Sequence, residues 1–201
     1  IVAVRGTAKA SEWLTNLNAQ KIGAGDAEPD YHPGFMREAW DGMIELRAKL
    51  GPALDRPHLY FTGHSLGGAI AALLAPRMNG HTAYVFGSPR FGNARAVTAA
   101  EPYAYVRPDD LVPHLPPSAL GYADAASSLE VVGDGPPVQA AGWPTLQSWL
   151  TPGRRFAVQH AVEGYCRHLA RAAGVVSPEL TFLELRRAYA RPFQNPAPPI
   201  P

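Results

Sequence analysis

The sequence is poor in cysteine and in net charge. Cys166 is the only cysteine among 201 residues, which excludes an intrachain disulfide and a zinc site built on cysteines. The formal net charge of +1 argues against a nucleic-acid-binding protein, because such a protein needs a basic face to neutralise phosphates. A run of about 18 apolar residues, the length that spans a bilayer, is also lacking, so no membrane-spanning helix is expected.

The chain begins without a signal peptide or an initiating methionine. It opens on residues 1–4, Ile-Val-Ala-Val, a β-branched run that favours a buried strand. Chains rarely begin inside their own core, so we expect either a missing upstream segment or a fold reduced at its N-terminus. The absence of a signal peptide and of disulfides leaves secreted and cytoplasmic locations equally open.

Apolar residues make up 46% of the chain, enough for a substantial core. We expect one domain over residues 1–193 and a proline-rich tail over 194–201. Strands are expected at 1–4, 58–62, 83–86, 103–107 and 129–132, and helices at 11–18, 35–50, 69–76, 159–173 and 179–190, with 133–156 loop-like. Because strands alternate with helices, the pattern predicts an α/β fold with a largely parallel central sheet and helices on both faces.

Residues 63–67, Gly-His-Ser-Leu-Gly, fit the pattern Gly-x-Ser-x-Gly. A predicted strand precedes them and an apolar helix follows, as a nucleophile elbow requires. Side chains at positions 63 and 67 would collide across so tight a turn, and the helix N-terminus would stabilise an oxyanion near Ser65. The alternative is a glycine-rich turn that carries a serine by chance.

A nucleophilic serine needs a base, and on this fold the chain order is serine, acid, histidine. That order leaves His114, His160 and His168. His160 follows a loop and begins a helix, so it is the first candidate, with His168 second and His114 a rim or structural residue. Asp109 and Asp110 both follow a predicted strand, and their position alone does not choose between them.

The oxyanion hole needs two N–H donors. We expect one from Leu66, directly after the serine, and one from Thr7, after the first strand. Two apolar groups of side chains stand apart from these residues. Trp13, Leu14 and Leu17 form a stripe on the helix expected at 11–18. A patch in the loop-like stretch comprises Trp143, Leu146, Trp149 and Leu150.

These residues resemble the class 3 lipases, the fungal-type triacylglycerol lipase group of the α/β-hydrolases. The matching segments are residues 4–7, 32–35, 62–69, 86–93 and 110–117, and His160 with Tyr165 after it. The resemblance selects Asp110 over Asp109. It also places Trp13, Leu14 and Leu17 where the family carries its lid helix, so their stripe is either a lid over a lipid-binding site or ordinary core packing. The patch of Trp143, Leu146, Trp149 and Leu150 either lines an acyl site or packs within its loop. The chain departs from the family in having no disulfides and in lacking the helix and strands that usually precede the oxyanion strand.

The resemblance implies a serine carboxylic-ester hydrolase, and foremost a lipase that hydrolyses acylglycerols through Ser65, His160, Asp110 and an acyl-enzyme. A short-chain or aromatic-acid esterase, a phospholipase and a non-catalytic hydrolase-like binding protein are the alternatives. No metal or cofactor is required. The expected partners are a lipid or other ester substrate and, transiently, a lipid interface; the oligomeric state stays open.

Overall fold

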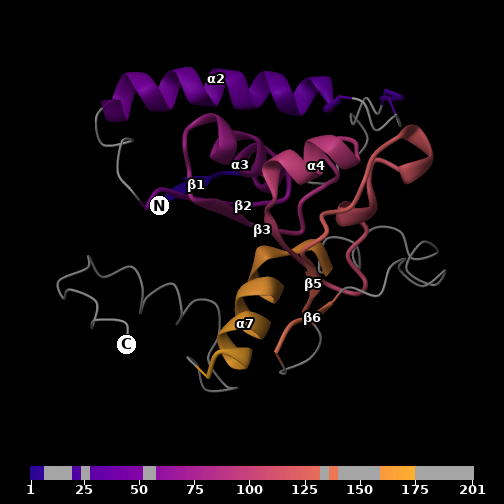
Figure 1. Ribbon diagram of the computed structural model, residues 1–201. Helices are drawn as coiled ribbons and strands as arrows, with labels where there is room; N and C mark the ends of the chain where they lie inside the picture. The colour runs from indigo at the N-terminus through magenta and orange to yellow at the C-terminus, as the bar shows by residue number, and fades with distance from the viewer. Residues whose placement is uncertain (7–19, 24–27, 52–57, 132–135, 140–158, 175–201) are drawn as a thin grey trace.

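The described part of the chain forms a single sheet with helices above and below it (Figure 1). The structure is a computed structural model that describes residues 1–6, 20–23, 28–51, 58–131, 136–139 and 159–174. Within these ranges the strands are β1 (Val2–Val4), β2 (Tyr60–His64), β3 (Thr82–Phe86), β4 (Tyr103–Val106), β5 (Ser128–Glu130) and β6 (Val138–Gln139). They are ordered β1-β2-β3-β4-β5-β6. Neighbours from β1 to β5 are parallel, and β6 pairs antiparallel with β5.

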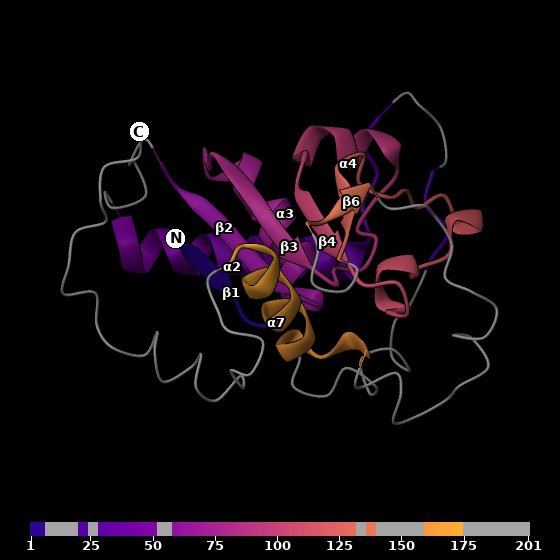
Figure 2. The same cartoon turned by 90° about the horizontal axis from the view of Figure 1, so that it is seen from below.

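Helices cover both faces of this sheet, as the views in Figures 1 and 2 agree. They are α2 (Pro33–Leu50), α3 (Leu66–Arg77), α4 (Ala94–Ala100) and α7 (Val162–Ala172). α3 packs on β2 and β3 and carries α2 on its outer side, whereas α7 lies on the opposite face of the sheet. The predicted α/β class, with a largely parallel sheet and helices on both faces, is confirmed.

The core lies between the sheet and α3. Every residue of α3 from Gly67 to Ala75 is buried, which explains why this helix is apolar on all sides. Phe61 and Val85 of β2 and β3 are buried against it. Because side chains alternate along a strand, the last residue of β2, His64, points to the other face, where α7 lies.

Several elements differ from the prediction. β2 starts at Tyr60 and continues to His64, two residues later at each end. α4 was not expected, and its start is fixed locally by the Asn93 side chain, which accepts the Ala96 N–H at 2.9 Å. β6 lies in a stretch expected to be loop, and both of its residues are exposed, so they carry no alternating pattern. On α7, Cys166 is exposed, whereas Tyr165, the residue before it, is buried.

The described helices include none with both the length and the apolarity that crossing a bilayer demands. The predicted helices at 11–18 and 179–190 and the tail at 194–201 lie outside the described residues.

Candidate active site

Ser65 occupies a sharp turn between β2 and α3. Its φ of 58° lies in the left-handed region, which is strained for a residue other than glycine. The Ser65 N–H donates to the Phe86 carbonyl of β3 at 3.0 Å and so fixes the turn to the sheet. A Cβ on Gly63 would overlap the backbone of Gly67, and a Cβ on Gly67 would overlap Val4 of β1. The backbone therefore has the elbow that the sequence predicts. A side chain at Gly63 would collide across the turn as expected, whereas at Gly67 the obstacle is the chain at the end of β1.

The Ser65 side chain lies at the start of α3. It is 2% exposed, and its Oγ makes no hydrogen bond within the described part of the chain. Leu66, the other predicted member of this turn, is the first residue of α3. The partial positive charge of a helix N-terminus therefore lies beside the hydroxyl, and such a charge stabilises an anion placed next to it.

Asp110 and His160 form a buried pair after β4 and before α7. They are 1% and 3% exposed, and His160 Nδ1 lies 2.9 Å from Asp110 Oδ2 and 3.1 Å from Oδ1. A carboxylate accepts hydrogen bonds, so Nδ1 carries the proton of the neutral ring. The other ring nitrogen, Nε2, is then the basic one and has the tautomeric form needed to receive a proton.

Two further donors hold the Asp110 carboxylate. The Val112 N–H donates to Oδ1 at 3.0 Å, and the Tyr165 hydroxyl donates to Oδ2 at 2.6 Å. Burial, and secondarily the negative charge of Asp110, raises the pKa of Tyr165 well above its usual value, so this hydroxyl stays protonated and donates. Sequence reasoning singled out Tyr165 only through the family resemblance.

Gly87 leaves the space in which these groups meet. Its φ is +55°, a conformation that side chains rarely adopt. A Cβ there would lie 2.9 Å from Asp110 Oδ2 and 3.2 Å from His160 Cε1. The sequence placed this glycine after a predicted strand and within the family-like segment 86–93. Its closeness to Asp110 and His160 depends on residues far along the chain, so no local pattern shows it.

The structure separates the remaining candidates from this pair. Asp109 is exposed, whereas its neighbour Asp110 is buried against His160. His168 lies within α7, eight residues after His160. His114 follows the acid in the chain, and its backbone carbonyl accepts a hydrogen bond from Arg90 at 2.7 Å. The geometry thus brings Asp110 and His160 together and leaves Asp109, His114 and His168 out of the pair.

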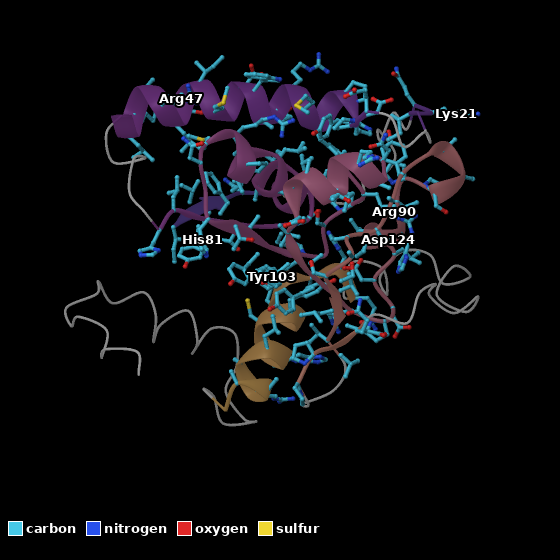
Figure 3. The ribbon with its side chains drawn as sticks, in the orientation of Figure 1. Lys21, Arg47, His81, Arg90, Tyr103 and Asp124 are labelled. Atoms are coloured by element: carbon cyan, nitrogen blue, oxygen red, sulfur yellow. The ribbon has the colours of Figure 1, made fainter. Side chains whose placement is uncertain are left out.

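Arg90 supports the segment that follows Asp110. Its buried guanidinium donates to both carboxylate oxygens of Asp124, at 2.7 and 2.9 Å, and to the carbonyls of His114 and Pro116 (Figure 3 labels Arg90 and Asp124). A bidentate ion pair of this kind fixes geometry as well as charge. The cavity of about 260 Å³ beside it is lined by Arg90, Asp109, His114 and Asp124, but by neither Ser65 nor His160.

Other predicted site residues lie outside the described residues. They are Thr7, Trp13, Leu14 and Leu17, and the patch formed by Trp143, Leu146, Trp149 and Leu150. Gly6, the residue before Thr7, lies against the elbow, since a Cβ on it would be 2.5 Å from the His64 carbonyl oxygen. Residues 1–6, 20–23, 28–51, 58–131, 136–139 and 159–174 contain no group of three metal-ligating side chains.

Comparisons of the sequence with family models and with curated proteins agree on one family. The model of the family "Lipase (class 3)" matches residues 1–120. "Secreted mono- and diacylglycerol lipase 1" of Fusarium solani is 39% identical over 137 residues, which cover 61% of this chain and 40% of that protein. "Phospholipase A1-II 1" of Oryza sativa is 29% identical over 182 residues, which cover 72% of this chain and 46% of that protein. The chain therefore spans less than half the length of these curated relatives.

A solved structure agrees with this result. A triacylglycerol lipase with a serine-protease triad at its catalytic centre superposes with a TM-score of 0.55 and 25% identity, over 67% of this chain and 59% of that one. This similarity confirms the α/β-hydrolase fold that the sequence predicts.

Proposed function

Because this chain belongs to the class 3 lipase family, we propose that it is a serine hydrolase that cleaves carboxylic esters of acylglycerols. The buried hydrogen bond between Asp110 and His160 is the observation that carries this proposal. His160 lies close to the elbow: its ring centroid is 4.5 Å from that of His64, the residue before Ser65. The mono- and diacylglycerol lipase relative favours acylglycerols as the substrate class.

In the proposed reaction, Ser65 Oγ attacks the ester carbonyl carbon while His160 Nε2 takes the hydroxyl proton. Asp110 holds Nδ1–H and stabilises the imidazolium that forms. The negative charge on the former carbonyl oxygen is bound by the N–H groups of Leu66 and Thr7. His160 then gives its proton to the leaving alcohol oxygen, and Ser65 keeps the acyl group.

Water completes the cycle by the same chemistry. His160 Nε2 takes a proton from water as the water oxygen attacks the acyl-enzyme carbonyl, and it returns the proton to Ser65 Oγ as the acid leaves. Neither half of the proposed cycle uses a metal or a cofactor. The burial of Asp110 and His160 supports this assignment, because the attraction between carboxylate and imidazolium is stronger away from water.

A phospholipase is the second candidate, since the rice relative bears that name. Both reactions attack an ester between a fatty acid and glycerol, so the same Ser65, Asp110 and His160 would serve either. In both cases we propose that the protein makes transient contact with a lipid interface, where Trp13, Leu14 and Leu17 would form the lid.

Substrate preference tests this proposal directly. We expect kcat/KM for p-nitrophenyl esters to rise with acyl length, by up to about 4-fold for each CH₂ that the site buries, because a buried CH₂ is worth about 0.8 kcal/mol. Monoacyl- and diacylglycerols should be hydrolysed faster than phosphatidylcholine in matched mixed micelles. Activity limited to the shortest acyl chains, with no gain above the aggregation point of the substrate, would instead support a short-chain esterase.

A further inference from the structure

The His64 side chain binds the backbone that carries His160. Its Nε2 lies 2.7 Å from the carbonyl oxygen of His160. A carbonyl only accepts hydrogen bonds, so Nε2 of His64 carries a proton and donates it. The last residue of β2, His64, therefore donates to the backbone of His160, and the residue directly after it is Ser65.

His64 does this as a neutral ring. Burial, followed by the neighbouring His160, lowers the pKa of His64 to about 4, while Asp110 and Glu163 oppose that shift. The neutral side chain adds no positive charge next to the imidazole that is proposed to become charged. Its contribution at neutral pH is therefore a hydrogen bond and its packing.

Arg107 makes a second contact of this kind, with the backbone carbonyl of the residue before His160. It follows the last residue of β4, and its Nη1 donates to the Gln159 carbonyl at 2.7 Å. The guanidinium carbon lies 5.9 Å from the centre of the Tyr165 ring, and a Cβ on Gly164 would overlap the guanidinium. A glycine at position 164 thus leaves room for Arg107 to reach past α7 to the backbone beyond its start.

We propose that His64 and Arg107 are positioning residues for His160, acting as a clamp on the consecutive carbonyls of Gln159 and His160. We call this pair of side chains the carbonyl clamp. Ala161, the N-cap residue of α7, makes no side-chain capping bond. The clamp fixes the two residues just before it, and the inference rests on the proposed function of His160.

The clamp also explains how the site stays aligned. His64 adjoins Ser65, and Arg107 lies three residues before Asp110. The two strand ends that lead to the proposed nucleophile and acid therefore also hold the carbonyls of residues 159 and 160. β2 and β4 flank β3, and the His160 ring lies near the end of β3, since a Cβ on Gly87 would be 3.2 Å from its Cε1. A displacement of His160 by about 1 Å would lower the rate by about 10²-fold without weakening substrate binding to the same extent.

Paired variants of His64 test the clamp. His64→Met removes the donor and keeps an apolar side chain of similar length, whereas His64→Gln keeps an N–H near the position of Nε2. We expect His64→Met to lower kcat by about 10²-fold with KM changed by less than about 3-fold, and His64→Gln to recover at least about 10-fold of that loss. His81→Met, at an exposed histidine, is the matched control and should leave kcat unchanged.

Two results would overturn the clamp: His64→Met with wild-type kcat, or His64→Gln as slow as His64→Met. If His64→Met does not fold, Arg107→Lys and Arg107→Met replace the pair under the same criteria.

The His160 Cε1 signal in NMR spectra of histidine-labelled protein gives a readout that needs no activity. It should shift in His64→Met and return towards the wild-type position in His64→Gln. If the wild-type protein hydrolyses no ester, the proposed function fails, and this spectrum still decides the clamp.

Discussion

Ser65→Ala is expected to lower kcat for ester hydrolysis by about 10⁴- to 10⁶-fold. The alanine has no oxygen to form the acyl-enzyme, so only binding and the oxyanion donors remain to accelerate attack by water. The Ser65 side chain is buried and its Oγ makes no hydrogen bond within the described part of the chain, so its loss breaks no such contact. Rates with a p-nitrophenyl ester and melting temperatures of both proteins provide the measurement.

The matched control is Ser118→Ala, because Ser118 is exposed and lies at the start of a short turn far along the chain from the elbow. Its kcat should equal that of the wild-type protein. Persistence of the wild-type rate in Ser65→Ala would contradict the serine mechanism and require another residue as the nucleophile.

Asp110→Asn is expected to lower kcat by about 10⁴-fold while KM changes little. An amide NH₂ facing Nδ1 favours the tautomer with the proton on Nε2, so His160 can no longer accept a proton from Ser65. The imidazolium also loses the charge that stabilises it. Steady-state rates measured between pH 7 and 9 test the effect, and circular dichroism establishes that the variant is folded.

The neighbouring aspartate offers a close control. Asp109→Asn removes the same charge from the adjacent position, but Asp109 is exposed and takes no part in the hydrogen bonds to His160. We expect its kcat to stay within about 2-fold of wild type, as for most exposed substitutions. If Asp109→Asn caused the large loss and Asp110→Asn did not, the proposed acid would be the wrong one.

The sequence was most informative where local sterics decide the structure. The elbow around Ser65 could be predicted because a strand, a turn too tight for side chains at Gly63 and Gly67, and an apolar helix follow one another directly. The parallel sheet followed from the alternation of strands and helices. Asp110 could not be separated from Asp109 by such arguments, since which of two adjacent side chains enters the core is decided by packing. The family resemblance supplied that choice.

The sequence was least informative about contacts between distant residues. The chain order excluded His64 as the base and assigned it no other role, because its bond to the backbone 96 positions later has no local signature. Arg107 reaches Gln159 across 52 positions, and Tyr165 reaches Asp110 across 55. α4 and β6 were missed because seven and two residues are too few for a period to emerge. The roles of Thr7, Trp13, Leu14 and Leu17 stay predictions.

The central claim is that Ser65 is the nucleophile of an ester hydrolase, and covalent labelling tests it most directly. Diethyl p-nitrophenyl phosphate reacts with an activated serine and leaves a stable phosphoryl group that mimics the tetrahedral intermediate. We predict one equivalent of p-nitrophenol per chain, loss of esterase activity in step with its release, and a single modified peptide with the label on Ser65. An esterase-active protein whose label falls on another residue, or that takes up none, would contradict the claim.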